Sequence, residues 1–433
     1  MISALRRLTR VRPTLRGAGL LGVGGALLIF GLVGGLPDIV GLATATLAIC
    51  VVAWLSQGLS RLNKGRGALS VSRAVLPMPV VRGEHAQVNL TVTPTRPTAT
   101  AYERLSRLHL SEQTAPELVG ETGLRAGVRA LPDRIEVGYA LAPLRRGRWE
   151  LGPLLATRQD AFGLARITAP LGSTNLVPVW PRTAELSARV GLLGELEASG
   201  AGMRMPSADD VVLRDYVPGD DPRRVHWPTA ARQSRLMVRA DEGAGMRPVT
   251  VLLDLGLLVP PGESESICGL TPDDGEWAVE LAASIACAVQ KTGHPTRLVA
   301  TQLTGLSDGA GFVSGAEAGR ATLLDETVDL VGHRTDTGAN TAMAATTLAL
   351  RQRHSPGEVF VAILRPQSGA ALRELTALGT EAGACWGLLV DTRRGRNTGQ
   401  AVDTLRSAGW RLTRTAPRTP MQHVWTALLE GAA

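Results

Sequence analysis

The segment from Arg214 to Arg232 concentrates ionisable side chains and turn residues immediately before the short apolar segment 236–239. Opposite charges at this density form charge-assisted hydrogen bonds, and an arginine can bind a neighbouring carboxylate in a bidentate manner. Pro218-Gly219 and Asp220-Asp221-Pro222 predict two changes of chain direction. The candidate site residues of this segment, which we call the charged run, are Arg214, Asp215, Tyr216, Gly219, Asp220, Asp221, Arg223, Arg224, His226, Trp227 and Arg232.

Two interpretations of the charged run stay open at this point. In the first, its carboxylates and guanidinium groups form a buried network that holds two domains together. In the second, they form a surface that binds a protein partner. We expect a mixed arrangement in which Asp220 and Arg232 are structural, while Arg224 and His226 are exposed and available to a partner.

His226 lies among acidic residues, a setting that raises the question of metal binding or acid–base catalysis. A single histidine in a charged turn is more often an ion-pair or packing residue, and no zinc-site spacing surrounds it. The sequence contains no phosphate-binding loop of the type Gly-x-x-x-x-Gly-Lys-Ser/Thr. The glycine-rich segment 309–315 has no lysine followed by Ser or Thr, and a flexible loop is predicted there. We therefore expect no catalytic residue and no cofactor.

Asp254 is a separate candidate because it directly follows an apolar run, 249–253, that is typical of a buried strand. Ligands of open α/β sheets bind beyond the carboxyl ends of the strands, which is where Asp254 lies. The other interpretation is structural: the carboxylate bonds neighbouring backbone amides at the strand end.

The elements around Asp254 alternate between apolar strands and helices, which predicts a doubly wound, mostly parallel sheet. The predicted strands are 249–253, 296–301, 359–364, 386–390 and 410–413. The predicted helices are 277–290, 341–351, 373–379, 402–408 and 424–429.

The preceding residues, from 68 to about 182, are typical of a small β-sandwich. Short and partly alternating runs bounded by Pro and Gly predict strands over 69–73, 87–93, 135–141 and 176–180. Residues 111–134 show no period, and we predict a loop there. A connecting helix is predicted over 184–198, before the charged run.

Composition narrows the classes of protein. A chain of 433 residues, of which 44% are apolar, has room for two or three domains with hydrophobic cores. Residues 1–66 hold eight basic residues and one acid (8 − 1 = +7), which equals the net charge of +7, so the rest of the chain is neutral. A neutral body disfavours nucleic-acid binding.

The four cysteines lack a Cys-x-x-Cys spacing and are expected to be reduced and buried.

Two uncharged apolar runs, 17–36 and 39–59, are each long enough to cross a membrane as a helix. We predict a transmembrane hairpin that turns at Pro37-Asp38. A cleaved signal peptide is disfavoured because the small residues 43–45 lie inside the second run. Basic residues flank both outer ends, so the positive-inside rule predicts a multi-pass plasma-membrane protein with both termini in the cytoplasm.

The first apolar run is rich in glycine. Gly31 and Gly35 have the spacing that allows close approach of two helices, and we expect the two helices of the hairpin to use it. Neither run contains a charged residue, and two helices cannot enclose a substrate path, so a transporter is disfavoured.

Three segments resemble the bacterial family called domain of unknown function 58. They are the charged run with the residues that follow it to Asp254, the segment Arg145-Arg-Gly-Arg-Trp-Glu-Leu-Gly-Pro153, and Asp160-Ala-Phe-Gly-Leu164. The resemblance implies a membrane-anchored protein with a von Willebrand A-like domain. It also implies partnership with a MoxR-type AAA+ ATPase in the assembly or regulation of envelope complexes.

The resemblance also bears on metal binding. In von Willebrand A domains that bind a divalent cation, an aspartate at the place of Asp254 opens an Asp-x-Ser-x-Ser motif, but Gly256 and Leu258 stand at the serine positions here. Thr341 corresponds to the threonine of that family, yet Arg365 follows the strand 359–364 where a carboxylate is needed. A hard cation requires several oxygen ligands, so we predict a degenerate, metal-free site.

The sequence thus predicts four parts. They are a basic N-terminus with two transmembrane helices (1–66), a β-sandwich-like domain (67–182), a connecting helix with the charged run (183–245), and a von Willebrand A-like, Rossmann-like α/β domain (246–433). The leading hypothesis is a membrane-anchored cytoplasmic scaffold or adaptor that binds protein partners. The alternative is a cation-dependent hydrolase at the membrane face.

Overall fold

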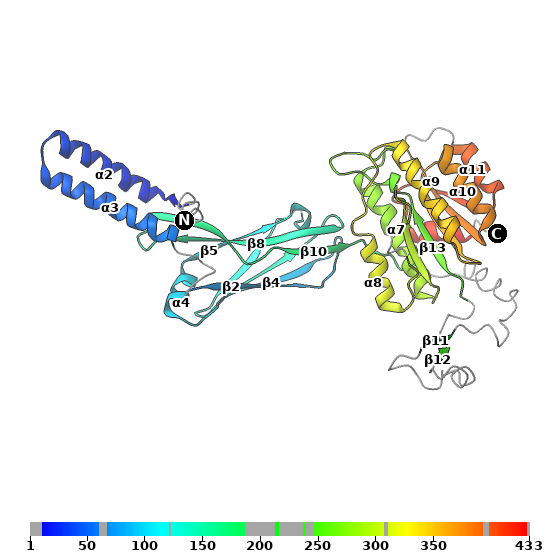
Figure 1. Cartoon of the computed structure of the whole chain (residues 1–433), viewed down its shortest axis with the longest axis horizontal. Helices are drawn as coiled ribbons and strands as arrows, with labels where there is room; N and C mark the ends of the chain where they lie inside the picture. Colours follow the sequence, from blue (N-terminus) through cyan, green and yellow to red (C-terminus); the bar gives the residue numbers. More distant parts are fainter. Residues whose placement is uncertain are drawn as a thin grey trace. The chain divides into compact units, whose positions relative to one another are not determined.

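A computed structural model describes residues 11–59, 67–120, 123–186, 246–306, 311–392 and 398–430, with the backbone alone at 213–215 and 237–239. The chain divides into two compact units, Met1–Trp180 and Pro181–Ala433 (Figure 1).

The first unit begins with a pair of adjacent helices, α2 (Leu15–Val33) and α3 (Pro37–Leu59), both long and apolar enough to cross a membrane. Thr14 caps α2 by accepting a hydrogen bond from the Gly17 amide. The connection is 34–36, whereas Pro37 and Asp38 form the first turn of α3. The predicted turn at Pro37-Asp38 is therefore wrong, because proline lacks an amide hydrogen and fits the first position of a helix.

Glycines on one face of α2 determine how closely the two helices pack. Gly24 and Gly31 are buried, and a Cβ atom would lie 3.1 Å from Leu47 at Gly24 and 2.9 Å from Val40 at Gly31. Gly31 thus acts as the sequence suggested. Gly35 does not, because it lies in the connection with a positive φ of 63° and its Cβ position faces open space.

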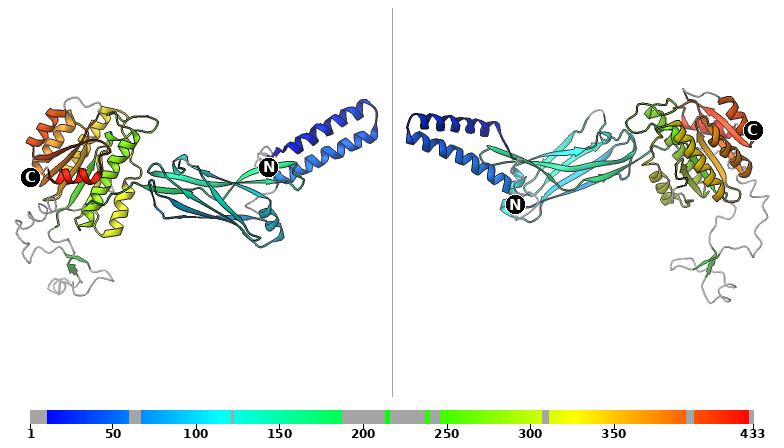
Figure 2. Two further views of the ribbon diagram at one scale, coloured as in Figure 1. Left: turned by 180° about the vertical axis from the view of Figure 1, so that it is seen from behind. Right: turned by 45° about the horizontal axis from the view of Figure 1, so that its top comes forward.

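Two sheets form the rest of the first unit (Figure 2). The first contains β1 (Arg12–Pro13), β9 (Ala165–Leu171), β8 (Gly147–Gln159), β10 (Asn175–Trp180), β3 (Val80–Val81) and β5 (Leu108–Thr114). The second contains β2 (Leu69–Leu76), β4 (Ala86–Pro94), β7 (Ile135–Leu141) and β6 (Ala126–Ala130), and helix α4 (Ala99–Ser106) follows β4. Buried side chains of both sheets share common clusters, as in a β-sandwich.

The predicted loop over residues 111–134 is wrong. It contains the end of β5 and all of β6. Every residue of β6 is exposed at the edge of its sheet, so the strand lacks the alternation of apolar and polar residues that reveals a half-buried strand.

One arginine with a buried side chain links the two sheets and accounts for the glycine at position 152 of the motif 145–153. Arg73 of β2 donates to Glu112 of β5 at 2.5 Å and to Asn175 of β10 at 2.8 Å. Gly152, at φ 96°, lies against this guanidinium group, and a Cβ atom there would be 2.7 Å from Arg73 Nη2. The glycine of the Gly-Pro pair is therefore a packing requirement of the sandwich.

The second unit contains a five-stranded sheet in the order β14-β13-β15-β16-β17, with all neighbours parallel. Its strands are β13 (Val249–Leu253), β14 (Thr296–Ala300), β15 (Val359–Leu364), β16 (Ala384–Val390) and β17 (Trp410–Thr415). Its helices are α7 (Pro272–Lys291), α8 (Ala316–Glu326), α9 (Asp336–Arg353), α10 (Gly369–Glu381), α11 (Thr398–Ser407) and α12 (Met421–Glu430).

Helices cover both faces of this sheet. Side chains of α7, α8 and α12 pack on one face, and side chains of α9, α10 and α11 pack on the other. The doubly wound parallel sheet predicted from the alternating strands and helices is thus confirmed. Helix α8 was not predicted.

In the sequence before β13, β11 (Leu213–Asp215) pairs with β12 (Met237–Arg239) in an antiparallel manner. Residues 184–186 have no regular secondary structure, and the remainder of the predicted connecting helix lies outside the described residues.

Candidate functional site

The candidate site lies where the strand order of the parallel sheet reverses. The chain passes from β13 to β14 on one side and later returns to β15 on the other, so β13 and β15 flank the topological switch point. Open α/β sheets bind their ligands at this place, beyond the carboxyl ends of the strands. Asp254 directly follows β13 and Arg365 directly follows β15.

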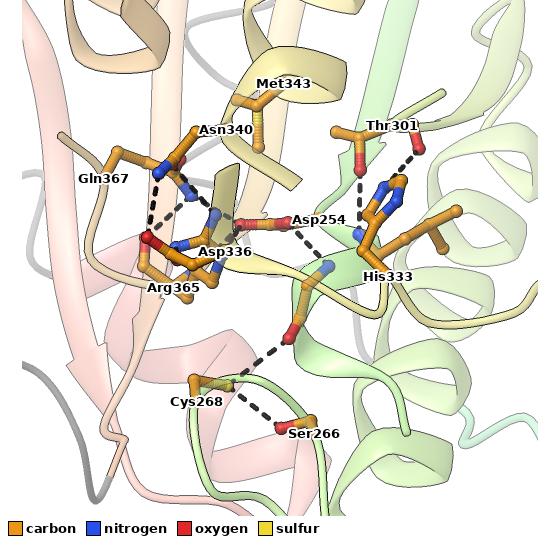
Figure 3. Close-up of polar contacts among 12 residues, drawn as sticks. Asp254, Ser266, Cys268, Thr301, His333, Asp336, Asn340, Met343, Arg365 and Gln367 are labelled. Carbon is orange, nitrogen blue, oxygen red and sulfur yellow. Dashed lines mark hydrogen bonds and ion pairs between the residues drawn. The ribbon is translucent and has the colours of Figure 1, made fainter. Parts of the chain in front are cut away.

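The Asp254 carboxylate is fully buried and surrounded by donors (Figure 3). It accepts hydrogen bonds from the Gly256 amide at 2.8 Å and from the Gln367 side-chain amide at 2.5 Å. Arg365 Nε lies 3.3 Å from Asp254 Oδ2, an ion pair without the alignment of a hydrogen bond. A buried carboxylate requires such a partner, because an isolated buried charge is costly.

The other end of the Arg365 guanidinium group contacts the first turn of α9. Arg365 donates to Asp336 Oδ1 at 2.9 Å and to Asn340 Oδ1 at 3.0 Å (Figure 3). These two residues are four positions apart and lie on one face of the helix. The side chain of Arg365 is only 5% exposed, so the guanidinium group is held between β13 and α9.

Thr341 follows Asn340 in α9 but does not join this group. Its side chain is exposed, and its hydroxyl donates to the Thr337 carbonyl at 2.8 Å within the helix. Of the two residues predicted for a degenerate metal site, the structure brings only Asp254 to the switch point.

The residues present do not fit a divalent cation. A Cβ atom at Gly256 would lie 2.4 Å from Arg365 Nε, so a serine at this position would collide with the guanidinium group. Leu258 is apolar and buried. Within the described residues, no group of three His, Cys, Asp or Glu side chains is placed to hold a metal ion. The positive charge beside Asp254 comes instead from the chain itself.

The loop after Asp254 is fixed from two further directions (Figure 3). The Leu255 amide donates to Thr301 Oγ1 at 2.9 Å, and His333 Nε2 lies 3.2 Å from the Thr301 carbonyl. On the other side, the Cys268 thiol donates to the Gly256 carbonyl at 3.4 Å. Burial raises the pKa of the Cys268 thiol, which keeps it protonated as a donor.

Arg365, Gln367, Asp336 and Asn340 were not predicted as site residues. One signal was present in the sequence: Arg365 stands where a metal site requires a carboxylate. One strand is followed by a buried aspartate, and the neighbouring strand is followed by an arginine. This arrangement indicates an ion pair between the two side chains as well as a missing metal ligand.

The charged run is placed only in part. Arg214 and Asp215 belong to β11, where Asp215 pairs with Met237 of β12. The other residues of the run, Tyr216, Gly219, Asp220, Asp221, Arg223, Arg224, His226, Trp227 and Arg232, lie outside the described residues. Both interpretations of the run therefore stay predictions.

The fold and the site define a doubly wound α/β domain whose switch point is filled by an internal ion pair. Residues 212–362 match the model of the family described as "Protein of unknown function DUF58". The resemblance found in the sequence is confirmed for this segment, which includes the charged run and Asp254. The motifs 145–153 and 160–164 lie before it.

The solved structures that resemble parts of this chain include the following three. BatB from Bacteroides thetaiotaomicron is 14% identical, with 43% of this chain and 96% of that chain covered, at a TM-score of 0.27. A von Willebrand factor type A protein from Catenulispora acidiphila is 13% identical, with 43% and 41% covered, at a TM-score of 0.27. The PilB minor pilin from Streptococcus sanguinis is 11% identical, with 87% and 88% covered, at a TM-score of 0.30. No match was found among curated proteins.

Proposed function

We propose that this chain is a membrane-anchored cytoplasmic scaffold whose sandwich and von Willebrand A-like α/β domain bind protein partners. The anchor is the pair α2 and α3, because both helices have the length and apolar composition of membrane spans. Their exposed side chains include Ile29, Leu32, Val33, Leu42 and Val52. A water-facing helix pair of this composition is unfavourable, whereas a bilayer covers such side chains.

The observation that carries the binding role is the closed switch point. In a ligand-binding α/β domain this crevice receives a substrate or a cation. Here Arg365 and Gln367 fill it and bond to Asp254. Interaction surfaces elsewhere on the chain then carry the function, and the charged run lies within the segment that matches the family.

The resemblance to the family suggests the partner. A MoxR-type AAA+ ATPase, acting with this chain in the assembly or regulation of envelope complexes, is the partner we propose. The alternative, a cation-dependent hydrolase, requires a cation at the position that Arg365 occupies, and no specific observation favours it.

A crosslinking pull-down from native membranes tests the partner. The full chain is the bait, and a hairpin-only fragment, residues 1–66, is the control for membrane proteins that adhere to the anchor. We expect a AAA+ ATPase to be enriched with the full chain alone. Equal recovery with both baits, or recovery of no ATPase, contradicts the proposed partner.

Reporter fusions after Ala433 test the orientation. The basic flanks of the hairpin predict that a cytoplasm-active reporter functions and a periplasm-active one does not. The opposite result contradicts the cytoplasmic placement. A mature N-terminus near Thr46 would show that α2 is removed and that the hairpin is not the anchor.

A further inference from the structure

The connection between β8 and β9, residues 160–164, docks on the beginning of α2. Its shape is held internally, because the Asp160 carboxylate accepts the Phe162 amide at 3.0 Å and the Ala165 amide at 2.6 Å. Thr14, the N-cap of α2, then donates its amide to the Leu164 carbonyl at 2.9 Å and its hydroxyl to the Gly163 carbonyl at 2.5 Å. We call residues 160–164 the docking turn.

Close packing fixes the docking turn at one end of the helix pair. A Cβ atom at Gly17 would lie 2.0 Å from the Leu164 carbonyl oxygen, so only glycine allows this approach. Leu164 is buried in a small cluster with Cys50 and Ala53 of α3. The turn therefore lies beside the first residues of the apolar run in α2. Phe162, in the middle of the turn, is 71% exposed.

A groove of about 1020 Å³ lies between the docking turn and the two helices. Arg16, Gly19, Leu20 and Val23 of α2 line it, together with Ala48, Ile49, Val52, Ala53 and Ser56 of α3. At a rise of 1.5 Å per residue, the seven steps from Arg16 to Val23 span about 10 Å along the helix. One leaflet of a hydrocarbon core is about 15 Å thick, so the groove extends well into it.

The groove has one charged end and an apolar remainder. Arg16 lies at its end and is exposed, with Arg12 nearby in sequence and also exposed. The carboxylate of Asp160, which also lines the groove, accepts hydrogen bonds from the Phe162 and Ala165 amides. Toward Val23 and Ile49 the groove continues into the exposed apolar surface of the helices.

We propose that this groove binds an anionic phospholipid of the surrounding bilayer. One acyl chain packs between Leu20, Val23 and Ile49, and the phosphate group pairs with Arg16. Phe162 lies at the headgroup level, where aromatic side chains are favoured. The proposal rests on membrane insertion of the hairpin, since the groove faces acyl chains only in that setting.

Native mass spectrometry of the full chain in maltoside micelles tests the site. The protein is titrated with phosphatidylglycerol and with phosphatidylcholine of identical acyl chains. A basic residue near an anionic surface contributes on the order of 1 kcal/mol, so we expect about fivefold preference for phosphatidylglycerol. In Arg16→Gln the preference disappears, while phosphatidylcholine binds as to the wild type.

A pair of glycine variants separates the groove from general lipid contact. The Cβ positions of Gly19 and Gly25 both face open space, but only Gly19 lines the groove. Gly19→Leu fills the groove, and we expect retention of both lipids to fall several-fold. Gly25→Leu makes the same chemical change on the same helix and leaves retention unchanged.

Two kinds of failure are distinguishable. Equal binding of the two lipids by the wild type, or equal retention by Gly19→Leu and the wild type, overturns the lipid site alone. Extraction of the wild-type protein from native membranes by alkaline carbonate shows that the hairpin is not inserted, which overturns the proposed anchor and with it the lipid site.

Discussion

Arg365 Nε lies 3.3 Å from Asp254 Oδ2, and these two residues directly follow neighbouring parallel strands on the two sides of the switch point. Both side chains are buried. Arg365 therefore supplies, from within the chain, the positive charge that neutralises the Asp254 carboxylate. In metal-dependent domains a bound cation supplies this charge.

The first prediction concerns this ion pair. Replacing Arg365 with Met leaves the Asp254 carboxylate buried and uncompensated, and we expect a loss of about 3–5 kcal/mol in the free energy of unfolding. Arg414→Met is the matched control, because Arg414 forms an exposed pair with Asp391 at 2.8 Å. Exposed pairs contribute less than about 1 kcal/mol. Denaturant unfolding of residues 67–433 measures both variants, and equal losses contradict the assigned role of Arg365.

The second prediction concerns metal ions. Because the guanidinium group fills the place beside Asp254, isothermal titration of residues 67–433 with Mg²⁺ or Mn²⁺ is expected to show no specific binding. A stoichiometric site in the low micromolar range that Asp254→Ala abolishes would overturn the metal-free assignment. Arg365→Ala removes the guanidinium group and opens space beside the Asp254 carboxylate. This variant therefore tests whether Arg365 is the group that excludes a metal ion.

The third prediction concerns pH. Burial, with a contribution from the neighbouring Asp325, raises the pKa of Glu326 from 4.5 to about 7. The Glu326 carboxyl then binds its proton more tightly in the folded state than in the unfolded state. The resulting stabilisation of the folded state is complete below pH 4.5 and is lost as the pH rises to about 7. Glu326→Gln is expected to remove this decline from the melting temperatures of residues 67–433. Glu317→Gln, at an exposed position of the same helix, is the control and keeps it.

The fourth prediction concerns the packing of α2 against α3. A side chain at Gly31 meets both the Val40 side chain and its backbone nitrogen, at 2.9 and 3.0 Å. Gly31→Leu therefore separates the helices, and the melting temperature of the full chain in micelles should fall. Gly25→Leu adds the same side chain to open space and should not lower it. Equal melting temperatures for the two variants would show that Gly31 does not set the approach of the helices.

The fifth prediction separates the two interpretations of the charged run. If Arg223, Asp220 and Arg232 form a buried network, Arg223→Ala should cost about 3 kcal/mol in stability, because a charge loses its partner. If Arg224 faces a partner, Arg224→Ala should leave the melting curve unchanged and weaken association with the ATPase. Equal destabilisation by both variants, with binding lost only in proportion to folded protein, would leave no support for a binding surface.

Much of the fold was predictable because its strands differ sharply from their surroundings. Val249–Leu253 and Val359–Leu364 are mostly apolar runs buried on both faces, and buried residues of β4 alternate with exposed or half-buried ones. Elements without such patterns were missed. Helix α8 has a weak apolar face, and β6 lies fully exposed at a sheet edge. The local sequence of such an element does not show which neighbouring helix or strand it contacts. Its secondary structure is therefore determined by tertiary contacts.

Of the ion pair at the candidate site, only Asp254 could be predicted from the sequence. Asp254 stands out because a lone carboxylate follows an apolar strand. Its partner Arg365 lies 111 residues later, and only the parallel pairing of β13 with β15 brings the two together. Gly256 was identified as a missing ligand. Its structural role is to leave space for the guanidinium group, which depends on the approach of a distant side chain.

The contact between Thr14 and the docking turn has a consequence for biogenesis. These residues lie 149 and 150 positions apart, so a ribosome completes α2 long before it reaches Gly163 and Leu164. Domains fold in the order of their synthesis. In the proposed setting, α2 and α3 enter the bilayer first, and the sandwich acquires its last strands against helices already in place. The sandwich then completes its folding at the membrane surface. If insertion of the helices fails, the docking turn has no correctly placed α2 to contact.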